Sequence, residues 1–204
     1  MPLQHDEPSA LIYKLVHDRL GALAYHRAFC TPHLSEADPD DLQISTPHRV
    51  GFLTTHGLEA GSMWHRAIEP GGWRFLIHHG DKVVAAVDTV IGKNGKHRFG
   101  HIYEGPLVAG TEEAIRFAEG HATIRSSNFQ PILVIAPSLS VSFLLLRNRT
   151  TNCSDHLIAL PPLFAGLQGG ELLRPEDVAT VLRNISIRKR AHASNSPEGQ
   201  GSIN

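Results

Sequence analysis

The chain has little of what marks secreted, metal-binding or membrane proteins. Its only cysteines, Cys30 and Cys153, are far apart in the sequence. This spacing provides neither a disulfide framework nor a metal-binding motif, and free thiols in a reducing compartment are expected. The longest apolar runs, PILVIAP and SFLLL, are too short to cross a bilayer. The N-terminal stretch has early acids and no apolar core, unlike a signal peptide. We therefore expect a cytoplasmic protein without a membrane partner.

The chain also lacks an excess of charge of either sign. With 19 basic and 20 acidic side chains, its formal net charge is -1. Such a balance gives no global field to attract nucleic acid. The one basic run, 188–190, follows a predicted helix, where cations suit the negative end of the helix dipole. No nucleic-acid partner is expected.

Histidine is the residue type that is unusually abundant, with 14 copies. It titrates near neutral pH, so such a supply is compatible with metal binding, proton transfer or pH sensing. His97 and His101 share a predicted strand face but lie about 13 Å apart along it, too far to chelate one ion. There is no HExxH motif and no set of His and Cys ligands, so no metal site is predicted. A histidine-dependent pH sensor stays open, as does a simple scatter over the surface.

Composition and length favour one α+β domain. Hydrophobic residues make up 41% and charged residues 19% of the chain, as in globular proteins. A chain of this size fits a single core. The predicted layout is a flexible N-terminus (1–9), a single α+β domain (10–190) and a disordered tail (191–204). Within the domain we expect a helical part (10–70), a sheet part (73–165) and a C-terminal helix (174–188).

Periodicity predicts the helices. Apolar residues at helical spacing follow Ser9, a plausible N-cap, and predict a first helix over 10–29. Prolines and acids in 31–41 predict a loop. Thr46-Pro47 resembles the start of a second helix over 47–68, weakened by three glycines. Thr111 is expected to cap a third helix.

After residue 72 the pattern changes to that of strands. Segments 73–79, 82–91 and 97–105 predict a three-stranded antiparallel meander, the core of a mostly antiparallel sheet with flanking helices. The apolar run 130–137 predicts a strand buried on both faces. Segment 138–148 fits helix or strand equally well, and 153–164 predicts a further strand.

Turn chemistry in the meander gives an expected register. If Asn94-Gly95 is a two-residue hairpin loop, Asp88 lies opposite His101. Cross-strand neighbours have Cβ atoms about 5 Å apart, within reach of a hydrogen bond. A carboxylate held against an imidazole raises its basicity, which is how a general base is made. Asp88 and His101 are therefore candidate catalytic residues. The alternative is a buried polar pair whose members satisfy each other.

The preceding turn extends this register. If Gly80-Asp81 is also a two-residue loop, Trp73 lies opposite Asp88. One face of the sheet then collects four aromatic residues around the polar pair, and we expect these to contact a ligand: Trp73, Phe75, Phe99 and Tyr103.

The turn between the third meander strand and the third helix is a second candidate site. Gly105, Gly110 and Thr111 lie in a glycine-containing turn before a helix, where free backbone N–H groups can hold an anion. Glu112 stands where a phosphate loop requires lysine, which excludes nucleotide hydrolysis of that type.

The expected order of elements is two helices, a meander, a helix, a buried strand, an undecided element and a last strand. Over residues 10–165 it resembles the GNAT-type acyltransferase superfamily. In that family the turn after the fourth strand binds the pyrophosphate of acyl coenzyme A, and Gly110 is the residue here that matches the loop pattern. The resemblance implies acyl-CoA as cofactor and a small-molecule substrate.

These observations leave several functions open, and they do not decide whether the chain is an enzyme. The first is binding of a small ligand or a protein partner, through the aromatic face or the glycine-containing second helix. The alternative is a GNAT-like acyl-CoA-dependent N-acyltransferase that uses Asp88 and His101 as its base and 105–111 as its anion site. Outside that alternative the sequence indicates no cofactor.

Overall fold

The computed structural model describes residues 3–45, 47–59, 64–150, 154–163 and 167–194. One mixed sheet of eight strands dominates it, in the order β5-β4-β3-β2-β6-β7-β8, with β1 paired to β3. The predicted α+β class is confirmed. The strands are β1 (Leu42–Ile44), β2 (His48–Leu53), β3 (Ile68–His79), β4 (Lys82–Ile91), β5 (His97–Tyr103), β6 (Phe129–Ala136), β7 (Val141–Asn148) and β8 (His156–Leu160).

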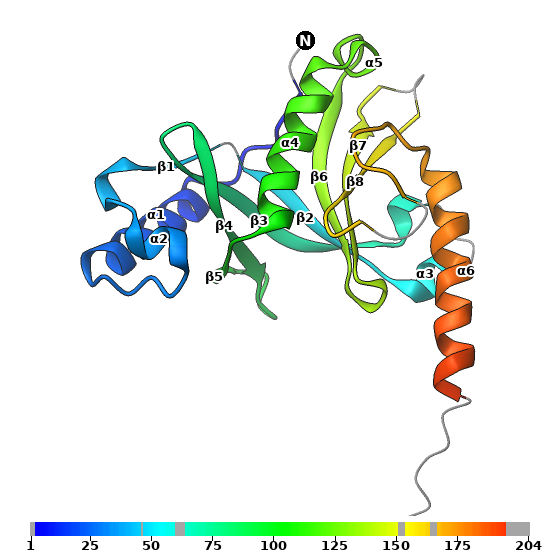
Figure 1. The fold of residues 1–204 in the computed structure, drawn as a ribbon, viewed down its shortest axis with the longest axis horizontal. Coiled ribbons are helices and arrows are strands. Elements are labelled where there is room, and N and C mark those ends of the chain that lie inside the picture. The colour runs from blue at the N-terminus through cyan, green and yellow to red at the C-terminus, as the bar shows by residue number, and fades with distance from the viewer. Residues whose placement is uncertain (1–2, 46, 60–63, 151–153, 164–166, 195–204) are drawn as a thin grey trace, which may run out of the picture.

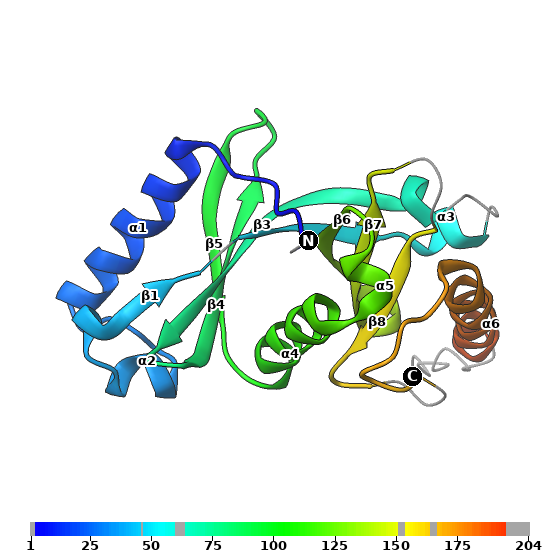
Figure 2. The ribbon, with the colours of Figure 1, turned by 90° about the horizontal axis from the view of Figure 1, so that it is seen from above.

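Helices flank this sheet along its length (Figure 1). They are α1 (Ala10–Tyr25), α2 (Pro32–Glu36), α3 (Thr55–Glu59), α4 (Pro106–Gly120), α5 (Ala122–Arg125) and α6 (Pro175–Ser194), with 3₁₀ turns η1 (Pro39–Asp41), η2 (Trp64–Arg66) and η3 (Pro137–Leu139). Figures 1 and 2 show α1 and α2 at one end of the sheet, α6 at the other and α4 between them. No helix within the described ranges is long and apolar enough to cross a bilayer.

A parallel pair of strands joins two antiparallel halves into this sheet. β2 pairs antiparallel with β3 on one side and parallel with β6 on the other. The β3–β4–β5 half and the β6–β7–β8 half are each antiparallel. β6 is buried along nearly its whole length, as the continuous apolar run predicted.

The two faces of the sheet are covered by different helices. On the α1 face, Trp73, Phe75 and Ile77 of β3 pack against Ile12 and Val16 of α1. The same face of β6 to β8 forms the largest apolar cluster, covered by Val178 and Leu182 of α6. On the opposite α4 face, Leu76 and Ala86 contact Val108 of α4.

Residues 3–9, expected to be flexible, form an arm that lies against the sheet. Leu3 is buried in the core on the α4 face, and the Gln4 amide donates to the carbonyl of Phe129. The Asp6 carboxylate lies 3.3 Å from Arg49 Nε and 3.5 Å from Arg149 Nη1. The arm therefore connects the beginning of β2 with the β6–β7 hairpin.

The predicted second helix over 47–68 is wrong. His48–Leu53 forms β2, and only the short α3 and the turn η2 are helical in the rest of the described segment. β2 alternates buried and exposed residues around a bulge between Val50 and Gly51. Burial between β3 and β6 overrides the local helix signal, because propensity is only a weak prior. Thr46, the predicted cap, lies outside the described residues.

Other boundaries differ less. The predicted loop 31–41 contains α2 and η1, and the undecided segment 138–148 is mainly strand β7. The last helix extends to Ser194, past the predicted end, and residues 195–204 of the predicted tail lie outside the described ranges. α4 begins at Pro106 with Gly105 as its N-cap, so the prediction that Thr111 caps this helix is wrong.

The meander strands are confirmed, but two bulges change their register. The β3–β4 register shifts between Ile77 and His78, which places Trp73 opposite Thr89 instead of Asp88. The β4–β5 hairpin closes with Ile91 opposite His97, so its loop is longer than the predicted two residues. A second bulge restores the predicted register farther along, where Ala86 pairs with Tyr103 as expected. A one-residue bulge leaves no periodic mark in a sequence.

A close contact between α4 and β8 gives a test of the packing. A Cβ built on Gly110 would lie 2.4 Å from Pro161 Cδ, whereas one on Gly120 meets no atom within 4 Å. We expect Gly110→Ala to lower the free energy of unfolding by about 1–3 kcal/mol, because the helix must move off the strand. Gly120→Ala is the matched control and should change it little. Urea denaturation of both variants measures this, and equal stabilities would contradict the contact.

Candidate functional site

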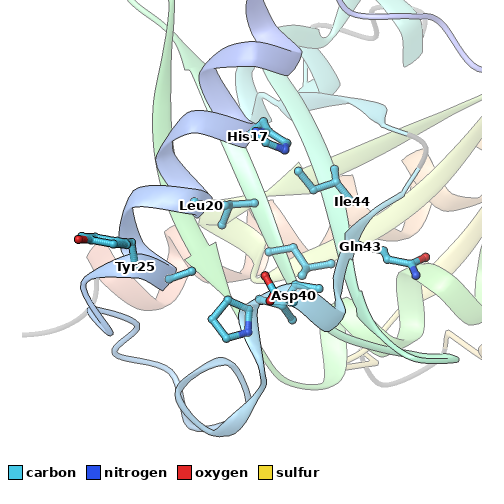
Figure 3. A pocket seen from close by; sticks show the side chains of 11 residues that line it. His17, Leu20, Tyr25, Asp40, Gln43 and Ile44 are labelled. Carbon is cyan, nitrogen blue, oxygen red and sulfur yellow. The ribbon is translucent and has the colours of Figure 1, made fainter.

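A cavity lies between α1 and β1 on the α1 face of the sheet. Its volume is about 680 Å³. Three separate segments line it (Figure 3): His17, Leu20, Gly21, Ala24 and Tyr25 of α1; Pro39, Asp40, Leu42, Gln43 and Ile44 of η1 and β1; and Ile77 of β3.

The cavity exists because small residues occupy the second half of α1. Ile12, Val16 and Leu20 bring the helix down onto the sheet. Beyond them, Gly21 and Ala24 supply no bulk, and a Cβ added at Gly21 would meet no atom within 4 Å. Glycine inside a helix costs about 1 kcal/mol relative to alanine. Alanine would also fit at Gly21, so the space beside α1 depends on the absence of a larger side chain there.

The lining combines an apolar floor with polar groups at the rim. Leu20, Leu42, Ile44 and Ile77 supply aliphatic surface. Figure 3 shows the Tyr25 ring and the Gln43 amide directed outward from the space between α1 and β1. An apolar body with a few polar groups around it is the usual composition of a small-molecule site.

A second cavity, of about 480 Å³, adjoins the first and shares Ala24 and Pro39 with it. Its lining is more polar and includes Arg27, Glu36 and Asp38. Arg27 follows the C-cap of α1 with φ of 48°, in the left-handed region. Non-glycine residues in this region cost of order 1 kcal/mol or more and are frequent at ligand-binding sites.

Away from this cavity, on the α4 face of the sheet, three buried polar residues lie on neighbouring strands and form a buried polar row: His48, Arg74 and Asp88. Arg74 Nε and Nη2 donate to the two carboxylate oxygens of Asp88 at 2.6 and 2.8 Å. Arg74 is 1% exposed and Asp88 is 7% exposed. The Tyr103 ring covers the guanidinium, with Arg74 Cζ 4.9 Å from its centroid. Buried guanidinium groups require such a bidentate partner.

This ion pair replaces the predicted Asp88–His101 pair. Because Val87 faces Ile102 and Thr89 faces Phe99, the bulge leaves Asp88 opposite both Gly100 and His101. Both oxygens of Asp88 already accept hydrogen bonds from Arg74. The exposed His101 ring lies instead 6.1 Å from that of Tyr103. The predicted hydrogen bond between carboxylate and imidazole is therefore not formed.

His48 extends the buried row onto β2, where it is opposite Arg74. It is 1% exposed, and neither ring nitrogen has a hydrogen-bond partner among the described residues. Burial, with contributions from Arg74 and His5, lowers the pKa of His48 to about 3. Burial also lowers the pKa of His5, whose Nδ1 is likewise unpartnered in the described part of the chain. Both rings are neutral at pH 7.

The structure separates the predicted ligand-binding aromatic residues. Trp73 and Phe75 are buried on the α1 face, and Phe99 packs against the same cluster. Tyr103 lies on the opposite face with Arg74. One aromatic surface of four residues is therefore not formed. Trp73 and Phe75 are core residues beneath α1, whereas Tyr103 is 39% exposed.

The residues of the predicted anion-binding turn also lie apart from one another, along the first turns of α4. Gly105 is the N-cap of α4 with φ of 104°. Gly110 packs against Pro161, and the buried Thr111 hydroxyl donates to the Leu107 carbonyl within the helix. The preceding Glu104 turns away and accepts hydrogen bonds from the backbone of α2. Only Gly105 lies at the helix start.

The sequence does not predict the cavity, because the segments that line it are separated in the chain and no sequence pattern connects them. His17 and Leu20 were counted in an ordinary amphipathic helix, and 39–44 fell in or beside a predicted loop. The available signal was Gly21 between Leu20 and Ala22 in the middle of that helix, since a glycine there usually serves packing or function.

Comparison of the chain with protein-family models, with curated proteins and with solved structures finds no match. Within the described ranges, no group of three or more His, Cys, Asp or Glu residues is placed to hold a metal ion.

The buried ion pair predicts an asymmetric response to mutation. Asp88→Ala leaves the Arg74 guanidinium buried without a counter-ion, so the free energy of unfolding should fall by about 3–5 kcal/mol. The double variant Arg74→Met/Asp88→Leu removes both charges and should be clearly more stable than Asp88→Ala alone. Chemical denaturation of the single and double variants measures this. If the losses of the single variants Arg74→Met and Asp88→Leu simply add up in the double variant, the assignment is contradicted.

His48 predicts a pH dependence of stability. Unfolded His48 binds a proton at its ordinary pKa near 6.5, whereas the folded ring does so only near 3. The contribution of His48 to the free energy of unfolding is therefore fully present above pH 6.5. It is lost progressively as the pH falls toward 3, because the unfolded chain then binds a proton that the folded chain does not. The slope is about 1.4 kcal/mol per pH unit. His48→Leu should flatten the stability profile in this window, and His26→Gln, at an exposed site, should not. If the free energy of unfolding depends on pH in the same way in His48→Leu and in the unmodified protein, His48 is not the source of this pH dependence.

Proposed function

We propose that the protein binds a small, largely apolar molecule in the cavity between α1 and β1. The observation that carries this proposal is the cavity itself, whose volume of about 680 Å³ lies in the range of small-molecule sites, roughly 300–1,000 Å³. The cavity opens to solvent at the surface, so a ligand could enter it without a rearrangement of the core.

The lining favours a ligand with an apolar body. Leu20, Leu42, Ile44 and Ile77 offer aliphatic surface without a charged group among them. His17 and Asp40 supply the polar contacts that would fix its orientation. Burying apolar surface contributes about 25 cal/mol per Å², so this floor supplies most of the expected affinity.

The adjoining cavity favours a ligand that also has a polar end. Arg27 lines that cavity, and its side chain forms no ion pair or hydrogen bond with the part of the chain that the structure describes. Glu36 and Asp38 line the same space and add negative charge. An elongated molecule with its apolar part beside Gly21 and its polar part near Arg27 would use both cavities.

Gly21 provides the test. The probe is 1-anilinonaphthalene-8-sulfonate, a dye with apolar rings and one anionic group. Gly21→Ala keeps the cavity open and should raise helix stability by about 1 kcal/mol. Gly21→Leu places a larger side chain at the wall and should abolish the saturable dye fluorescence. Unchanged dye affinity in a folded Gly21→Leu variant would refute the site.

A panel of small molecules extends this test to the ligand. A compound at one hundred times its Kd stabilises a fold by about 2.7 kcal/mol, visible as a higher midpoint of thermal unfolding. Compounds that stabilise the Gly21→Ala variant but not Gly21→Leu bind in the cavity. Acetyl coenzyme A belongs in the panel, because it tests the acyltransferase alternative. Stabilisation by it in both variants would assign the coenzyme to a different site.

A further inference from the structure

The β4–β5 hairpin loop and the start of β5 together carry a concentration of positive charge. Between Thr89 and Tyr103 the sequence has no aspartate or glutamate but contains Lys93, Lys96 and Arg98, with two histidines beside them. All three cationic side chains are exposed. None forms an ion pair with another described residue. In a chain of net charge -1, this local excess is not the average of the surface.

The acid on β4 and the acid directly after β5 are already paired elsewhere. Asp88 is bound to Arg74, and Glu104 is bound to His33 and the backbone of α2. Asp6 faces Arg49. Burial, with a contribution from Arg49, lowers the pKa of His97. The edge therefore has no local neutralising partner in the part of the chain that is described.

The backbone of β5 is available for pairing. β5 is the first strand in the sheet order, and its one strand neighbour in the described chain is β4. Figures 1 and 2 show it at the end of the sheet. An edge strand presents unpaired N–H and C=O groups, which another extended chain can use.

Apolar side chains accompany the charges. Val90 and Ile91 of β4 are each 40% exposed, and Tyr103 is 39% exposed. Val90 is opposite Arg98, and Ile91 is opposite His97. Arg98 and His97 of β5 therefore each have an exposed aliphatic neighbour on the same face. A partner with alternating acidic and apolar residues would match both faces of this edge.

We propose that the edge of β5 binds an acidic, extended polypeptide segment by strand addition. In this mode main-chain hydrogen bonds provide affinity, and alternate side chains provide specificity. Positive edges repel one another, so charge favours an acidic partner over a second copy of this chain. A strand edge offers hydrogen-bonding groups that match another backbone, which favours a polypeptide over a nucleic acid.

The test uses fluorescein-labelled peptides of about eight residues, a common strand length. Alternating Glu-Val is the probe. Lys-Val reverses its charge, and Glu-Pro keeps the charge but lacks the backbone N–H of every second residue. Binding is measured by anisotropy at roughly 50 mM salt, where surface charges are weakly screened. Hydrogen exchange of the β5 amides reports where the peptide lies.

The variant Lys96→Glu/Arg98→Glu reverses the charge of the edge. It should bind Glu-Val at least about tenfold more weakly, because two attractive charge pairs become repulsive. The matched control, Lys82→Glu/Arg188→Glu, changes the same net charge at exposed positions away from β5 and should bind like the unmodified protein. Binding of Glu-Val should also protect β5 amides from exchange.

Several outcomes would overturn the proposal. Equal binding of Lys-Val or Glu-Pro would show that neither acidity nor strand pairing matters. Unchanged exchange at β5 would place the peptide elsewhere. Tighter binding of oligothymidylate, lost in the edge variant, would make the edge a nucleic-acid surface. A dimer in sedimentation experiments that the edge variant dissociates would make it a self-association surface.

Discussion

The parallel pairing of β2 with β6 is the constraint on which the rest of the molecule depends. It joins two antiparallel halves, so the sheet must bury both of its faces at the centre. α4 supplies the cover on one face, while α1 and α6 cover the two ends of the other. Because His48 and Arg74 lie on strands next to this junction, their polar side chains are enclosed with it. The Arg74–Asp88 pair is thus a consequence of how the sheet is joined.

Much of the fold could be predicted where one pattern dominates a segment. α1, β4 and β6 have strong periodicity or continuous apolar runs, and all were found. β2 is not predicted, because Thr46-Pro47 is typical of the start of a helix. In addition, no local pattern in the sequence indicates that β3 and β6 lie on either side of this segment. The register of the meander failed for another reason. Each bulge moves the pairing by one residue, which changed the neighbour of Asp88 on β3 from Trp73 to Arg74.

The candidate site could not be predicted in the same way, because it belongs to no single element. Its floor combines Leu20 of α1, Ile44 of β1 and Ile77 of β3, which are distant in the sequence. The predicted site residues belong to one meander and to the turn that follows it. The fold distributes them between the core, the α4 face and α4. His48, whose pKa is far below its ordinary value, lies on the opposite face of the sheet from the cavity between α1 and β1. Electrostatic perturbation here therefore accompanies burial and does not mark the cavity.

The N-terminal arm has a practical consequence for work with this protein. Leu3 is buried, Gln4 bonds to β6, and Asp6 connects Arg49 with Arg149 across the beginning of the parallel junction. A fusion partner or affinity tag placed immediately before these residues competes for the space in which the arm lies. Trimming by an aminopeptidase would release the same contacts and expose the start of β2 and β6. Attachment after α6 leaves that junction closed, and recombinant versions are best extended there.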